Sequence, residues 1–201
     1  LLQLGTESAL HLALRAGDHL ITQQNEEGAW SSSSGQPALL GFSHGVAGYA
    51  AALARLHMFS GEERHHKAAA SALAYERARF NKDKGNWPDY RQRSSDSDSD
   101  QPSFMASWCH GAPGIALGRA CLWGTALWDE QCAQEIGVGL QTTAATQALA
   151  ADHLCCGSLG LMVLLEMLSC GPWSIDDQLK SHCQDVAAQH RLEALRRCSG
   201  E

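Results

Sequence analysis

GFSHGVAGYAAALARL, residues 41–56, is the first of three copies of one pattern. The other two copies are SWCHGAPGIALGRACL (107–122) and HLCCGSLGLMVLLEML (153–168). In each copy, two glycines three residues apart precede an apolar run. Glycines at this spacing let the first turn of a helix approach another backbone closely, and they permit the positive φ of a tight turn. The repeat therefore predicts three equivalent helices, each preceded by a glycine turn.

A second set of helices is expected between and after these copies, at residues 60–80, 128–150 and 174–197. The first of them is rich in alanine and has acids early and bases late, as a helix dipole favours. No stretch shows the alternation of a β-strand. Apolar helices that alternate with amphipathic ones are typical of an inner ring wrapped by an outer ring. We therefore expect an all-α fold in one domain over residues 1–201, and the family resemblance given below implies that it is a partial α/α toroid.

Polar or metal-ligating residues stand at the same position in all three turns. Directly before the first glycine come His44, His110 and Cys156, and one residue earlier come Ser43, Cys109 and Cys155. If the three helices start at a common level, these side chains meet at one centre. The repeat therefore predicts a site at the start of the three apolar helices.

The composition excludes several classes of protein. The chain has 201 residues, 44% of them hydrophobic, which is enough for a real core. The net charge is −7 and no basic stripe is visible, which argues against a nucleic-acid partner. No window reaches about 18 uninterrupted apolar residues, so we expect no membrane span. The eight cysteines lie in a long, Ala-rich and Leu-rich chain rather than a short disulfide scaffold, which favours the cytoplasm.

Two loops interrupt the helical pattern. Residues 25–37 are rich in Ser and Gly, and residues 81–104 contain the Ser/Asp run that we expect to be a solvated insert. Ahead of that run, in GNWPDYR (85–91), Trp87 and Tyr90 are expected either at the rim of a cleft or in the core.

Three cysteines, Cys109, Cys155 and Cys156, come from two equivalent turns. Adjacent cysteines rarely bridge each other, because the ring would be strained. Three thiolates match the ligand set of a metal site with an open fourth position. Buried cysteines without a metal, or a redox pair, are alternatives that spacing alone leaves open. The other five cysteines are expected to be small buried apolar residues.

In this order, GFSHGVAG, SWCHGAPG and DHLCCGSLG resemble the motifs of the lanthionine synthetase C-like family, the lanthipeptide cyclases. The CCG form of the third motif, with GNWPDYR upstream, is most similar to the C-terminal cyclase domain of the bifunctional class II synthetases. The resemblance covers about residues 1–170. It implies an α/α toroid and a zinc-dependent cyclase that adds cysteine thiolates of a dehydrated precursor peptide to dehydroalanine or dehydrobutyrine, which forms lanthionine or methyllanthionine rings.

The resemblance also assigns residues. It implies zinc as the cofactor, with Cys109, Cys155 and Cys156 as its ligands, and His44 as the catalytic residue that returns a proton. His110 is expected beside the ligands or merely in the packing around them. Asp152 and His153 are expected to hydrogen-bond the cysteine sulfurs or to polarise His44.

Two motifs of the family have no counterpart here: an early Y-D-G-x-x-G turn and a closing G-L-x-x-G-x-x-G turn. We therefore expect a fragment that lacks its first and last repeats, and a dehydratase domain in the parent chain is left open. A zinc- and thiol-binding member without cyclase activity and a non-catalytic helical scaffold remain alternative functions.

Overall fold

A computed structural model describes residues 1–31, 37–91, 102–149 and 151–199, and within these ranges the fold is all helical. Two isolated β-bridges, Asn81 with Asn86 and Asp89 with Ser103, lie outside the helices. The all-α prediction is confirmed. The helices are η1 (Leu2–Leu4), α1 (Glu7–Gln23), α2 (Val46–Ser60), α3 (Glu63–Arg77), α4 (Ala112–Cys121), α5 (Glu130–Ala144), α6 (Ser158–Ser169) and α7 (Asp177–Ser199).

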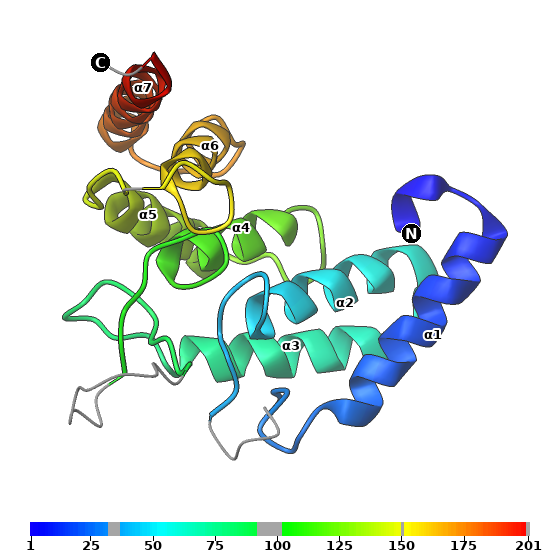
Figure 1. Cartoon of the computed structure of the whole chain (residues 1–201). Coiled ribbons are helices and arrows are strands. Elements are labelled where there is room, and N and C mark those ends of the chain that lie inside the picture. The colour runs from blue at the N-terminus through cyan, green and yellow to red at the C-terminus, as the bar shows by residue number, and fades with distance from the viewer. Residues whose placement is uncertain (32–36, 92–101, 150, 200–201) are drawn as a thin grey trace.

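Consecutive helices pack in pairs, α2 with α3, α4 with α5 and α6 with α7. The first members of the pairs also contact one another, α2 with α4 and α4 with α6. Figure 1 shows the pairs following one another from α1 to the red C-terminal helix α7. This is the arrangement expected for inner helices α2, α4 and α6 with outer partners in a toroid.

Across the part of the chain that the structure describes, no helix has both the length and the apolar character needed to cross a membrane.

A carbonyl oxygen packed against a glycine explains the start of each inner helix. The first glycine of each turn is the residue that precedes the helix, and the second lies within the first helical turn. A Cβ on the second glycine would overlap the carbonyl oxygen six residues earlier. The three pairs are Gly48 with Phe42, Gly114 with Trp108, and Gly160 with Leu154.

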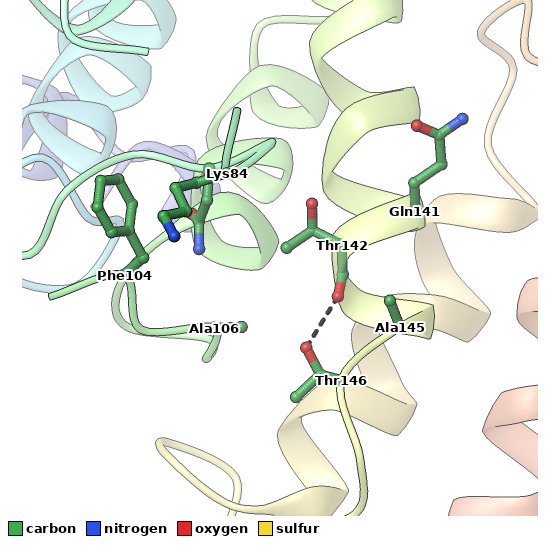
Figure 2. A pocket seen from close by; sticks show the side chains of 8 residues that line it. Lys84, Phe104, Ala106, Gln141, Thr142, Ala145 and Thr146 are labelled. Carbon is green, nitrogen blue, oxygen red and sulfur yellow. Dashed lines mark hydrogen bonds between the residues drawn. The ribbon is translucent and has the colours of Figure 1, made fainter. Parts of the chain in front are cut away.

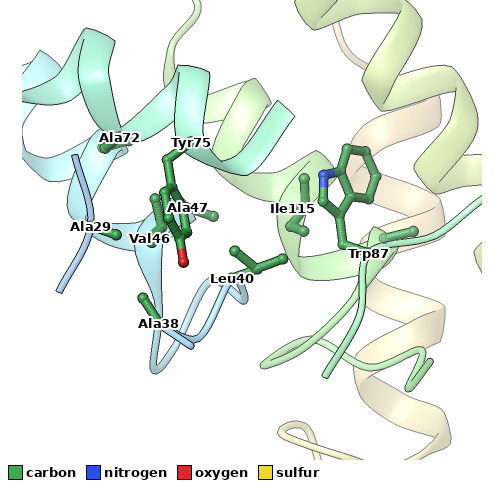
Figure 3. Packing of buried hydrophobic residues seen from close by; sticks show 11 residues of the cluster. Ala29, Ala38, Leu40, Val46, Ala47, Ala72, Tyr75, Trp87 and Ile115 are labelled. Carbon is green, nitrogen blue, oxygen red and sulfur yellow. The ribbon is translucent and has the colours of Figure 1, made fainter. Parts of the chain in front are cut away.

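The core beneath these turns joins helices from different pairs. Trp87 is 1% exposed, lies in one cluster with Leu40, Val46 and Ile115, and donates its indole N–H to the Glu76 carbonyl at 3.0 Å. Figure 3 shows this cluster between α2, α3 and α4. Of the two expectations for Trp87, the structure therefore supports core packing. The buried Trp87 side chain also fixes the 81–91 loop against the helices.

A buried chain of charges connects α3, α4 and α5. Arg119 of α4 is 1% exposed and pairs with Glu76 of α3 at 2.7 Å and with Glu135 of α5 at 2.5 Å. Arg77 continues the chain to Glu135 at 3.0 Å and to Asp129 at 2.7 Å. Burial raises the pKa of Glu76 to about 7, against the opposing charge of Arg119. Removal of one partner would leave a buried charge uncompensated, which is costly.

The glycine turn before α4 gives a test with an internal control. Gly111 has φ +77° and ψ −168°, a region that only glycine readily adopts, and a Cβ there would overlap the Met105 carbonyl. Gly124 has φ +78° but has open space around it. We expect Gly124→Ala to cost about 1 kcal/mol of unfolding free energy from backbone strain alone, and Gly111→Ala to cost clearly more. Urea denaturation of both variants measures this, and equal losses would contradict it.

The raised pKa of Glu76 predicts a pH dependence of stability. The pKa of Glu76 is about 7 in the folded chain, against the ordinary value of 4.5 in the unfolded chain. Between these two pH values, the folded chain holds a proton on Glu76 that the unfolded chain releases. The contribution of this group is therefore complete below pH 4.5 and is lost as the pH rises towards 7, by up to about 3 kcal/mol. The unfolding free energy of the wild type minus that of Glu76→Gln should fall across this range. A difference that rises with pH would show instead that Glu76 is ionised and stabilised by Arg119.

Candidate metal centre

The turns before α4 and α6 bring three cysteines together. The Cys109, Cys155 and Cys156 sulfurs all lie within 4.8 Å of one another, with 3.3 Å from Cys156 to each of the other two. These separations are far longer than a disulfide bond, and all three thiols are free. Sulfurs at two corners of a tetrahedral zinc site are about 3.8 Å apart, from a Zn–S distance of about 2.3 Å. The cluster can therefore hold a metal ion after a small adjustment of its side chains.

The three neighbouring thiols resist losing their protons unless a cation binds between them. Burial and the hydrogen bonds with Cys109 and Cys155 raise the pKa of the Cys156 thiol to about 12. Three thiolates at this spacing would repel one another, whereas a metal ion removes the thiol protons and joins the sulfurs. The donor set, three soft sulfurs with no carboxylate, is suited to zinc and other thiophilic ions.

Backbone and side-chain contacts fix the two cysteine loops. Ser107 Oγ lies 3.3 Å from the Cys109 sulfur and accepts the His110 N–H at 3.2 Å. In the other loop, His153 Nδ1 accepts the Cys156 N–H at 3.1 Å. His153 therefore holds the turn through the backbone of a cysteine rather than through its sulfur.

The loop before α2 lies directly against the Cys109 loop. A Cβ on Gly41 would overlap the Cys109 carbonyl, so only glycine fits this contact. The ring centroids of His44 and His110 are 5.7 Å apart and the rings are stacked, with an interplanar angle of 23°. His44 is exposed, whereas His110 is 2% exposed. The structure thus places the exposed His44 against His110, the residue that follows Cys109.

His110 is the buried partner in this stack. Burial, and then the charge of Arg91, lower the pKa of His110. Its Nε2 has no hydrogen-bond partner among the described residues. The contact with His44 is therefore made by a buried ring whose Nε2 no other described residue holds.

Asp152 makes a different contact from those expected. Its carboxylate pairs with Arg197 near the end of α7, at 2.5 and 2.9 Å, and this guanidinium lowers the pKa of the acid. The structure describes no hydrogen bond from Asp152 to a cysteine sulfur or to His44. Asp152 joins the cysteine loop to α7.

Arg91 is a charged residue near the site that the sequence analysis did not select. Asp89 is 7% exposed and holds the Arg91 guanidinium with both carboxylate oxygens, at 2.6 and 3.0 Å. The Asp89 carboxylate raises the pKa of Arg91, and the nearby Cys109 and Cys156 add to the effect. The only sequence signal is the Asp-x-Arg spacing in GNWPDYR, which does not reveal that this loop reaches the cysteines.

The comparison with protein families gives one match. The family model described as "Lanthionine synthetase C-like protein" matches residues 2–170, which include all three glycine turns. No curated protein matches the chain significantly.

The three-sulfur cluster predicts metal binding that depends on each cysteine. Addition of Co²⁺ to the metal-free chain should produce a sulfur-to-cobalt absorption band at a ratio of about one ion per chain. Cys109→Ser and Cys155→Ser should lose most of this band. Cys170→Ser, which changes an exposed cysteine outside the cluster, is the matched control and should keep it. Binding that survives both cluster substitutions would exclude this site.

Proposed function

Since this chain belongs to the lanthionine synthetase C-like family, we propose that it is a zinc-dependent lanthionine cyclase. It acts on a dehydrated precursor peptide and joins a cysteine to a dehydroalanine or dehydrobutyrine of the same peptide. The observation that carries the proposal is the cluster of Cys109, Cys155 and Cys156, with the exposed His44 stacked on His110, the neighbour of Cys109 in sequence. All eight cysteines are free, which supports a reducing compartment, the cytoplasm.

The cysteines would hold the zinc ion through three sulfurs and leave its fourth position to the substrate. When bound, zinc lowers the pKa of a substrate thiol so that it reacts as a thiolate. Arg91 places a fixed positive charge near the same sulfurs, and the buried Asp89 orients it. This charge partly balances the anionic cluster.

The reaction is an addition in which no group leaves. The cysteine sulfur of the substrate forms a bond to the β-carbon of the dehydroamino acid, and the electrons of its double bond move towards the carbonyl to give an enolate. The enolate is then protonated at the α-carbon. The proton released by the thiol equals the proton taken up, so the atoms balance without a further reactant.

His44 is the residue that we assign to this proton transfer. An imidazole changes charge near neutral pH, so it can accept a proton from the thiol and donate one to the α-carbon. The exposure of His44 makes its ring nitrogens accessible to a peptide, and the stacked His110 limits the tilt of the ring. His110 is therefore a positioning residue in this proposal.

The test compares two histidines in a cyclisation assay. His44→Asn should lower kcat roughly a hundredfold or more, because the proton donor is lost, while the zinc content stays at that of the wild type. His182→Asn changes an exposed histidine on α7 and should leave both unchanged. Ring formation is measured by thiol consumption and mass spectrometry with a synthetic peptide that carries one cysteine and one dehydroalanine.

Two results would contradict the proposal. A folded, zinc-loaded wild type that does not accelerate cyclisation would favour a zinc- and thiol-binding member without cyclase activity. A folded wild type without zinc would favour a helical scaffold.

A further inference from the structure

An open cleft of about 460 Å³ lies between two loop segments, 84–86 and 104–106, and the C-terminal end of α5. Figure 2 shows its two walls, with Lys84, Phe104 and Ala106 on one side. On the other side are Gln141 and Thr142 of α5, with Ala145 and Thr146 just after the helix. Thr142 Oγ1 donates to the Gly85 carbonyl at 2.7 Å and so joins the walls. This hydrogen bond holds the loop at Gly85 against α5.

The same wall is connected to the cysteine loop. Asn86 Oδ1 accepts the Ala112 N–H at 2.7 Å at the start of α4, and Asn86 Nδ2 donates to the Met105 carbonyl at 3.3 Å. Ala106, which lines the cleft, is three residues before Cys109. A chain that lies along this wall would therefore lead to the metal centre.

One antiparallel bridge holds the backbone of this wall. Ser103 pairs with Asp89 and accepts its N–H at 2.7 Å, and the Met105 carbonyl accepts from Asn86 Nδ2 at 3.3 Å. Among the described residues, no hydrogen-bond partner is recorded for the backbone N–H and C=O groups of Phe104 and Ala106. These groups can therefore pair with the backbone of another extended chain.

The charge of the cleft is positive and comes from Lys84. Lys84 is the sole charged side chain among the lining residues, and no ion pair of Lys84 is recorded within the described ranges. The other lining side chains are amides, hydroxyls, one phenyl ring and two methyl groups. The cleft therefore suits a neutral or acidic peptide better than a basic one.

We propose that an extended segment of the substrate peptide binds in this cleft as an added β-strand along residues 104–106, with an acidic side chain at Lys84. Pairing with an exposed strand edge is a general mode of peptide recognition, in which main-chain hydrogen bonds give the affinity. This inference rests on the proposed function for the identity of the ligand as a substrate peptide. The peptide main chain would then lie along the segment that continues to Cys109.

The first experiment tests strand pairing with backbone-modified probes. A short fluorescent peptide with one dehydroalanine, and serine in place of its cysteine, is methylated at one backbone nitrogen at a time, and its binding to the full chain is measured by anisotropy. Paired and unpaired N–H groups alternate along a strand, so methylation should weaken binding roughly fivefold at every second position of one stretch and little between them. Losses without this alternation, or no binding of the unmodified peptide, would overturn the inference.

The second experiment tests the charge with matched lysines. Lys82 and Lys84 are both exposed in the same loop, but only Lys84 lines the cleft. For a probe with aspartates, Lys84→Glu should raise Kd about tenfold, whereas Lys82→Glu should leave it nearly unchanged. Equal effects of the two variants would indicate a general charge effect and would overturn the role of Lys84.

The outcomes separate this inference from the proposed function. Cyclisation of the cysteine-containing peptide, without the alternation in binding, would overturn the strand pairing and leave the cyclase proposal standing. Alternation in binding without ring formation would support the cleft and count against the cyclase.

Discussion

The contact between a carbonyl oxygen and the second glycine of each inner turn is the constraint on which the rest depends. Because no Cβ intervenes at Gly48, Gly114 and Gly160, each helix begins in the same way against its own preceding loop. Residues just before the turn therefore reach the same level in every repeat. This common level brings cysteines 47 positions apart in the sequence, Cys109 and Cys156, to a sulfur separation of 3.3 Å.

The outer helices keep the inner helices at this level through two kinds of contact. Apolar clusters fill the space between the pairs, and the buried charges of Arg119, Glu76 and Glu135 connect three helices at fixed points. Ion pairs are directional, whereas apolar contacts allow sliding. The charged cluster thus restricts the relative positions of α3, α4 and α5, and with them the loop that carries Asp89 and Arg91.

The sequence predicts the local features well and the long-range ones poorly. Glycine spacing and apolar periodicity place α2 to α7, with ends that differ by a few residues: 128–150 was expected and Glu130–Ala144 is found. They do not predict α1, Glu7–Gln23. The cysteine cluster follows from the repeat register. The contacts of Asp152 with Arg197 and of Arg91 near the sulfurs depend on how separate segments pack, and no local spacing encodes them. The bridge between Ser103 and Asp89 likewise depends on how two loop segments pack.

The ion pair between Asp152 and Arg197 attaches the loop that carries Cys155 and Cys156 to the end of α7. Asp152 is three residues before Cys155, and Arg197 lies within the last turn of a long amphipathic helix. Helix ends open and close more readily than helix centres. Each opening of this end releases one support of the loop, so the positions of Cys155 and Cys156 depend on the order of a helix that carries neither of them.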